Sequence, residues 1–254
     1  MQNKKIKILS TGTLSNDIFE IANKESVELF DKPMIEITEH VSPFDSSKIK
    51  NLAAQKILAI FTSLHAVTPV IKHLKAIQSG YLTNDQPGAI PAIPSWDICC
   101  LDGKIKEAAI EYWEESSIIA TAKNANELSE IILQKNSRYP IVFFCGNRRM
   151  DALPTMLANH PFGFEEIAVY QTILTPKTIK KYYDTVVFFS PSAVESFFSK
   201  NKLEKDIPVF CIGQTTSAEI KKYCNNKINI AKKASKKYII EEAIKYFQTK
   251  KVQR

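Results

Sequence analysis

Short runs of β-branched and aromatic residues alternate with amphipathic segments along almost the whole chain. Such alternation is typical of parallel sheets wrapped by helices, because each strand is buried on both faces and each helix buries one stripe. We therefore predict an α/β fold. The predicted strands are Lys5–Thr11, Ile57–Ser63, Trp96–Cys100, Ile118–Thr121, Ile141–Cys145, Thr185–Ser190, Ile207–Ile212 and Ile228–Ala231.

The amphipathic segments carry apolar residues at helical spacing, and several begin with residues that favour a helix N-terminus. Pro191 suits a first helical position, because the N–H that proline lacks would have no partner there. The predicted helices are Asp17–Phe30, Ser46–Ala54, Leu64–Gln78, Lys104–Glu115, Ala125–Gln134, Met150–Ala158, Pro191–Lys200, Thr215–Cys224 and Ser235–Gln248.

Two extended, β-rich segments interrupt the alternation. We predict that they run side by side as linker strands, 34–41 and 166–173, between two lobes. One lobe is then continuous, 42–165, and the other is discontinuous, 1–33 plus 174–254. Each lobe is expected to be a doubly wound parallel sheet of the flavodoxin-like kind, with a ligand cleft between the two.

A weak internal repeat supports two lobes of like construction. Phe61–Val67 aligns with Phe188–Val194, each a strand that ends in hydroxyl residues and turns into a helix. Downstream, Cys100–Lys104 aligns with Cys211–Thr215, again at a change from strand to helix. Two lobes of this kind would place equivalent strand ends on opposite walls of one cleft.

The spacing of glycine and histidine excludes several common classes of site. The seven glycines are never closer than eight residues, so the chain has neither a G-x-G-x-x-G loop nor a Walker A loop. It also lacks a G-x-S-x-G elbow and an H-E-x-x-H pair. We therefore expect neither a nucleotide-binding loop nor a metal site.

The net charge of +7 is concentrated near the C-terminus, where residues 200–254 hold 14 Lys or Arg against 5 Asp or Glu. One interpretation is a solvated lysine face on the last predicted helix. The other is a positive field that attracts a polyanion, either nucleic acid or a polycarboxylate. Nucleic acid is the weaker alternative, because the chain lacks the interleaved aromatic residues and groove-binding motif of such surfaces.

Cysteine usage and apolar run lengths bear on localisation. Five cysteines without a repeated C-x-x-C spacing are expected to be reduced thiols, four of them inside apolar strands. The polar, basic first residues are not followed by an apolar segment, and no apolar run approaches 18 residues. We expect a cytoplasmic monomer with no membrane or nucleic-acid partner.

Four turns between strands and helices are rich in hydroxyl and small residues. Backbone N–H groups at such turns, together with the positive helix end, can receive carboxylates or phosphates. Serine and threonine are also preferred N-caps and need no ligand there. The four turns are Thr62-Ser63, Gly146-Asn147, Ser190-Pro191-Ser192 and Gly213-Gln214-Thr215-Thr216.

These same turns carry a family resemblance. In order and spacing, five motifs between Ile57 and Cys224 resemble those of uroporphyrinogen-III synthases. Each motif is weak alone, and the ordered set is fairly specific. The motifs are Phe61-Thr62-Ser63 with Ala66-Val67; the 143–148 run with Leu153-Pro154; Val169-Tyr170-Gln171-Thr172; Phe188 to Val194; and Ile212 to Thr216.

The resemblance implies a cofactor-free lyase that acts on hydroxymethylbilane, a linear tetrapyrrole with eight carboxylates, and closes it with inversion of the last ring. It implies Tyr170 as the proton donor to the departing hydroxyl, with plain packing as the alternative role. It also implies transient contact with hydroxymethylbilane synthase. The substrate-binding residues that it implies are Thr62, Ser63, Gly146, Asn147, Ser190, Ser192, Ala193, Gly213, Thr215 and Thr216.

This chain also departs from the family pattern. Members usually end the first strand with arginine and proline, where this chain has Ser10-Thr11-Gly12-Thr13, so any carboxylate contact from that arginine is in doubt. His65 stands where asparagine is common, and Asp102 and Ile105 replace a glycine and a threonine. The alternative function is a non-catalytic two-lobed binder of an anionic small molecule.

Overall fold

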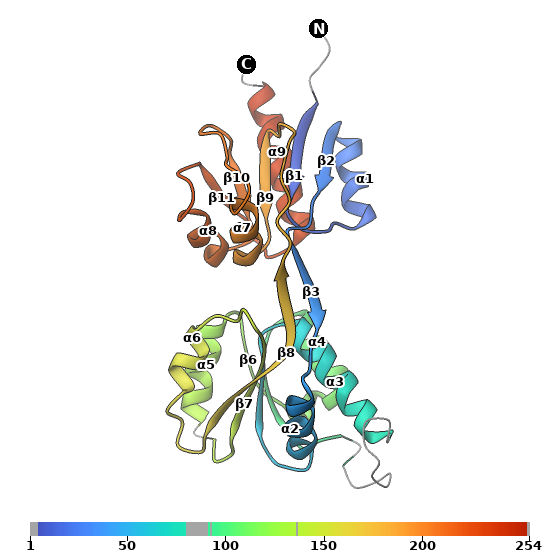
Figure 1. The fold of residues 1–254 in the computed structure, drawn as a ribbon, viewed down its shortest axis with the longest axis vertical. Helices are drawn as coiled ribbons and strands as arrows, with labels where there is room; N and C mark the ends of the chain where they lie inside the picture. Colours follow the sequence, from blue (N-terminus) through green and yellow to red (C-terminus); the bar gives the residue numbers. More distant parts are fainter. Residues whose placement is uncertain (1–4, 80–90, 92, 136, 253–254) are drawn as a thin grey trace. The chain divides into compact units, whose positions relative to one another are not determined.

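The computed structural model describes residues 5–79, 91, 93–135 and 137–252. The chain divides into two compact units: unit 1 holds Met1–Glu36 and Ile173–Arg254, and unit 2 holds Ile37–Thr172. Residues 1–4 and 253–254 of the first predicted lobe, and 80–90, 92 and 136 of the second, lie outside the described residues. Each unit contains one sheet with helices on both faces (Figure 1), so the predicted α/β class is confirmed.

Unit 1 is built on a parallel sheet in the order β11-β10-β9-β1-β2. α1 and α9 pack on one face of it, and α7 and α8 on the other. The order in which strands are added across the sheet reverses between β1 and β9, since β1 leads to β2 on one side and β9 leads to β10 on the other. The strands are β1 (Ile6–Ser10), β2 (Val27–Asp31), β9 (Thr185–Phe188), β10 (Val209–Cys211) and β11 (Ile228–Ile230); the helices are α1 (Asn16–Lys24), α7 (Pro191–Phe198), α8 (Gln214–Ile220) and α9 (Lys236–Val252).

Unit 2 is built on a sheet in the order β3-β8-β7-β4-β5-β6, with parallel pairing from β8 through β6. Helices α2, α3 and α4 pack on one face, and α5 and α6 on the other. The strands are β3 (Ile35–Glu39), β4 (Leu58–Phe61), β5 (Asp97–Leu101), β6 (Ile118–Ala122), β7 (Ile141–Gly146) and β8 (Phe164–Leu174); the helices are α2 (Pro43–Ala53), α3 (Leu64–Gln78), α4 (Lys104–Trp113), the short η1 (Glu115–Ser117), α5 (Ala125–Lys135) and α6 (Ala152–Leu157).

Aromatic side chains fill the core of unit 2 beneath α3 and α4. The rings of Phe61 and Phe144 stack with centroids 5.2 Å apart, and Trp96 stacks on Phe144 at 5.5 Å. All three side chains are buried, and the Trp96 indole N–H donates to the Leu52 carbonyl oxygen at 2.9 Å. Burying this much aromatic area between strand and helix holds the carboxyl end of β4 in place.

The two sheets share one topology in circularly permuted form. In unit 2, β7 is followed by β8 on one side of the sheet, and β4 leads to β5 and β6 on the other. In unit 1, β1 is followed by β2 in the same way, and β9 leads to β10 and β11. The repeat read from the sequence is thereby confirmed at the level of strands, because β4 and β9 occupy equivalent places. Each sheet therefore has a topological switch point, between β7 and β4 in unit 2 and between β1 and β9 in unit 1.

The predicted helix Asp17–Phe30 is wrong in its second half. α1 ends at Lys24, and Val27–Asp31 forms β2, which pairs with β1 in register. Ser26 has φ of 54°, a left-handed conformation that stops the helix. The apolar positions of this segment fit both helical and strand periods, and pairing with the edge of β1 decides between them.

The segment 166–173, predicted as a linker strand, lies within the longer strand β8. Phe164 to Tyr170 pair in parallel with β7, so this part belongs to the sheet of unit 2. β3 lies next to β8 in the sheet, and the boundary between the two units falls inside both strands. Within the described part of the chain, no helix combines the length and apolar character needed to span a membrane.

Candidate functional site

Three of the four hydroxyl-rich turns follow strands that flank the two switch points, and the fourth, Gly213 to Thr216, follows β10. In unit 2, Thr62-Ser63 follow β4 and Gly146-Asn147 end β7, and these strands are parallel neighbours. In unit 1, Ser190 follows β9, beside the turn that begins at Thr11 after β1. Carboxyl ends of parallel strands share one edge of a sheet, and ligands of such sheets bind outside that edge at the switch point.

Tyr170 lies at the centre of the unit 2 edge. It pairs with Gly146 across β7 and β8, and its phenol is hydrogen-bonded to the side chain of Ser63. Ser63 also caps α3, since its hydroxyl accepts from the His65 backbone N–H at 3.2 Å. The predicted residues at the ends of β4, β7 and β8 therefore meet at one place. The ring of His65, on α3, lies 5.8 Å from the Tyr170 ring.

The environment of Tyr170 keeps its phenol protonated. Burial raises the pKa of Tyr170 above its ordinary value of 10, and the hydrogen bond from Ser63 opposes that rise. A buried phenol resists ionisation because the phenolate loses more hydration than the neutral group. At neutral pH the group can therefore donate a proton or a hydrogen bond and cannot act as a phenolate base.

Asn147 orders the chain around Tyr170. Its backbone N–H donates to the Tyr170 carbonyl oxygen at 3.3 Å, and its side-chain oxygen accepts from the Thr172 N–H at 2.8 Å. Nearby, the Arg149 guanidinium is bonded to both Glu166 and Asp151, which raises its pKa and keeps it charged. These contacts fix the end of β7 against β8, so Asn147 has a structural role in addition to any contact with a ligand.

The predicted residues of unit 1 differ in accessibility. Ser190 caps α7, accepting from the Ala193 N–H at 3.2 Å, and Ser192 is half-buried in the first turn. Ala193 and Thr216 are 2% and 1% exposed, so their side chains belong to the core. Thr215 is exposed and follows Gly213, the N-cap of the short helix α8. This edge therefore offers mainly serine hydroxyls, Thr215 and backbone N–H groups.

Lys236 lies on the last predicted helix, whose lysines were interpreted either as a solvated face or as a source of positive field, and it was not among the predicted site residues. Lys236 is the first residue of α9, and its ammonium donates to the Thr13 carbonyl oxygen at 2.8 Å. The same ammonium lies 5.4 Å above the Phe189 ring, at the end of β9. One signal was available, since a lysine directly after a helix-capping serine faces the positive end of the helix dipole.

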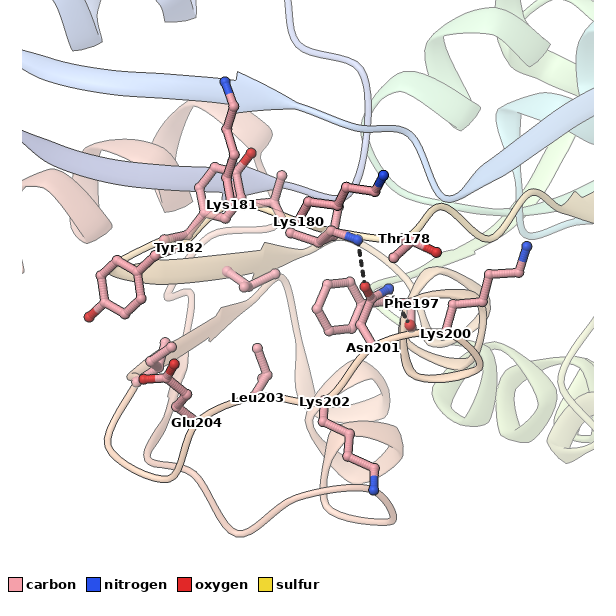
Figure 2. A pocket seen from close by; sticks show the side chains of 15 residues that line it. Thr178, Lys180, Lys181, Tyr182, Phe197, Lys200, Asn201, Lys202, Leu203 and Glu204 are labelled. Carbon is pink, nitrogen blue, oxygen red and sulfur yellow. Dashed lines mark hydrogen bonds between the residues drawn. The ribbon is translucent and has the colours of Figure 1, made fainter.

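A cavity of about 440 Å³ also opens in unit 1, lined by the segments before β9 and before β10. Asn201 joins these segments: its side-chain oxygen accepts from the Ile179 N–H at 2.7 Å, and its amide donates to the carbonyl oxygens of Lys177 and Phe197 at 2.9 and 2.8 Å. Lys180 and Lys200 lie on its rim (Figure 2). None of the sequence-predicted site residues line it.

The cysteines are free thiols, and four are buried. Burial raises the pKa of Cys99 and of Cys145 to about 12, with neighbouring Cys100 and Glu166 adding to the respective shifts. A thiol held protonated in this way is a poor nucleophile and a poor metal ligand. In the part of the chain that the structure describes, no group of three or more His, Cys, Asp or Glu side chains is placed to hold a metal ion.

Known proteins resemble this chain in sequence and in fold. Residues 19–241 match the family described as uroporphyrinogen-III synthase HemD. A mutant uroporphyrinogen III synthase from Thermus thermophilus is similar over 96% of this chain and 99% of that chain, with a TM-score of 0.71 and 14% identity. The Helicobacter pylori uroporphyrinogen-III synthetase covers 96% and 100%, with a TM-score of 0.59 and 16% identity.

The wild-type Thermus thermophilus enzyme is also similar, with a TM-score of 0.57 and 13% identity over 96% of this chain and 99% of that chain. At identities this low, the solved structures show a shared fold alone. The family assignment rests on the sequence match, which spans most of the chain and includes the four hydroxyl-rich turns. This chain belongs to the uroporphyrinogen-III synthase family.

Proposed function

We propose that this protein is the uroporphyrinogen-III synthase of a tetrapyrrole pathway and that it acts as a cyclising carbon–oxygen lyase on hydroxymethylbilane. The match of residues 19–241 to the family carries the proposal. The protonated phenol of Tyr170 at the switch point of unit 2 supports it, because the reaction begins with departure of a hydroxyl group.

The proposed reaction releases one water. Protonation of the terminal hydroxyl breaks its C–O bond, releases water and leaves an electron-poor azafulvenium cation. The substituted carbon of the last pyrrole attacks this carbon and forms a spiro intermediate, which fragments and recloses with that ring inverted. The final ring carbon loses a proton, so the macrocycle and water account for all atoms of the bilane. No redox partner is needed.

Control of conformation is the main task proposed for the protein. The free bilane closes directly to the uninverted isomer, so the enzyme has to bring a disfavoured carbon within reach of the azafulvenium cation. Backbone N–H groups in the first turns of α3 and α7 are proposed to receive substrate carboxylates. Thr62, Ser63, Gly146, Asn147, Ser190, Ser192, Gly213 and Thr215 remain the proposed contacts, with Ala193 and Thr216 contributing through backbone.

Tyr170 is proposed to supply the proton. Its phenol is held by Ser63, and its ring lies against Gly146, so the hydroxyl has a defined direction. A positioned donor of this kind contributes about 10²-fold or more to a rate. The competing assignment, plain packing on β8, predicts a turnover that does not depend on the phenolic oxygen.

The experiment that tests the function is incubation of freshly made hydroxymethylbilane with the protein, followed by oxidation and separation of the type I and type III porphyrins. We propose that type III forms without added metal or nucleotide after dialysis against a chelator. Binding of the bilane with only the buffer rate of type I formation would support the non-catalytic binder instead. A cytoplasmic location, a monomeric state and a transient contact with hydroxymethylbilane synthase belong to the same proposal.

A further inference from the structure

Lys236 joins three segments at the carboxyl edge of the unit 1 sheet. It opens the 17-residue helix α9, its ammonium donates to the Thr13 carbonyl oxygen at 2.8 Å, and it lies 5.4 Å above the Phe189 ring. Thr13 belongs to the turn after β1, and Phe189 directly follows β9. These two strands flank the switch point of this sheet, so the ammonium lies beside the place where a ligand of unit 1 would bind.

The position is electrostatically poor for a cation. The first turn of a helix exposes N–H groups and the positive end of the dipole, which favour an anion. Lys236 as a whole is exposed, yet its ammonium is partly withdrawn from water. This desolvation lowers the pKa of Lys236, and the negative charge of Asp31 opposes the change. Among the described residues, no carboxylate forms an ion pair with Lys236.

The backbone beside this ammonium is closely packed. A Cβ at Gly12 would lie 2.9 Å from Cδ2 of Phe189, so glycine allows the turn to approach the ring. The nearby Asp31 carboxylate is already engaged, since it accepts from the Leu14 N–H at 3.3 Å. An anion arriving at this edge would therefore meet a cation that has no ion-pair partner among the described residues, beside the positive end of the α9 dipole.

We propose that Lys236 is a substrate-binding residue that receives one acetate or propionate carboxylate of the tetrapyrrole at the switch point of unit 1. This inference rests on the proposed function. A carboxylate there neutralises the positive charge of Lys236, which the helix start and the Thr13 carbonyl leave uncompensated. The Phe189 ring shields one side of this ion pair from water. The competing role is a structural clip that ties α9 to the β1 turn.

The test compares Lys236→Gln with Lys237→Gln. Lys237 is the next residue, is exposed and has no recorded contact in the described structure, so both variants lose one positive charge from the same helix turn. We expect Lys236→Gln to raise KM for the bilane about tenfold and to weaken binding of uroporphyrin, a stable product analogue, by a similar factor. The kcat should stay within about twofold of wild type, and Lys237→Gln should leave both constants near wild type.

Two further measurements separate binding from a structural clip. Lys236→Arg keeps the charge and should recover most of the affinity, and the affinity difference between wild type and Lys236→Gln should shrink as salt is raised. Equal KM and uroporphyrin affinity in the two glutamine variants, or a loss confined to melting temperature, would overturn the inference. If the wild type still produces the type III isomer in that case, the proposed function stands and only the role of Lys236 is overturned.

Discussion

The ring of Tyr170 lies directly on the backbone of Gly146, so that a Cβ at Gly146 would be 2.9 Å from the phenolic oxygen and closer still to two ring carbons. The two residues pair across β7 and β8. Glycine is thus the residue that lets the phenol reach Ser63 at the end of β4. The relationship makes the smallest possible substitution a probe of the site.

Gly146→Ala should displace the phenol while leaving the fold intact, because the clash is with the far end of one side chain. We expect turnover to fall about tenfold or more, since a misplacement of about 1 Å at a reacting group can cost two orders of magnitude. Gly103→Ala, in the same unit and outside the proposed contacts, is the control: no described atom lies within 4 Å of its Cβ position, and its φ of 77° makes it report the cost of backbone strain alone. Steady-state kinetics of both variants, with circular dichroism to verify folding, checks this prediction. Equal activity of the two variants would contradict it.

Tyr170→Phe removes the phenolic oxygen and keeps the ring. If the phenol is the proton donor, turnover should fall roughly 10²-fold, and the uninverted isomer should rise as the spontaneous reaction competes. Because burial raises the pKa of Tyr170, the wild-type rate should not decline on the alkaline side below about pH 10 through loss of this proton. Tyr112→Phe is the control, since Tyr112 is also desolvated but bonds Gln78 on α3. A Tyr170→Phe enzyme with more than half the wild-type rate and an unchanged isomer ratio assigns Tyr170 to packing.

The thiols should separate into two classes on alkylation. Cys224 is partly exposed, whereas Cys99, Cys100, Cys145 and Cys211 are buried with raised pKa values. At pH 8 the native protein should take up one iodoacetamide quickly, at Cys224, and the other four only after unfolding, because the thiolate is the reacting form. Mass spectrometry of the native and urea-unfolded protein gives the count. Rapid labelling of Cys145 in the native protein would show that the end of β7 is more open than described.

Asn201→Ala tests what joins the two segments around the unit 1 cavity. The substitution removes three hydrogen bonds at 2.7, 2.8 and 2.9 Å, so the free energy of unfolding should fall by about 2–3 kcal/mol. Asn225→Ala, at an exposed position of the same unit, should change it by less than about 0.5 kcal/mol. Urea unfolding measures both. A matching, small effect would mean that apolar contacts alone hold these segments.

Much of the fold could be predicted from the sequence because buried parallel strands produce nearly continuous apolar runs. Ile141–Gly146 and Thr185–Phe188 are examples that are buried along their whole length. The error at 25–30 has a physical cause. The choice between helix and strand there depended on pairing with the edge of β1, which the local sequence pattern does not contain. Pairing of the first part of the segment 166–173 with β7 was not predicted, because it depends on a distant strand.

The candidate site was only partly predictable. The hydroxyl turns could be located because they follow apolar strands, but Ser63 and Tyr170 meet through the order of β4, β7 and β8, which the sequence does not state. Lys236 was missed because its neighbours are also lysines, and only the packing of α9 against the Thr13 turn distinguishes it. Thr216 was included on motif grounds, and its position on the inner face of α8 buries it.

The measurement that tests the central claim most directly is the porphyrin isomer ratio as a function of protein concentration at fixed bilane concentration. Enzymatic and spontaneous closure compete for the same substrate, so the type III fraction should rise with protein from near zero and approach completion. Tyr170→Phe should follow the same curve displaced to roughly 10²-fold higher concentration. A type III fraction that stays at the buffer value at every protein concentration would contradict the assignment of this chain as a uroporphyrinogen-III synthase.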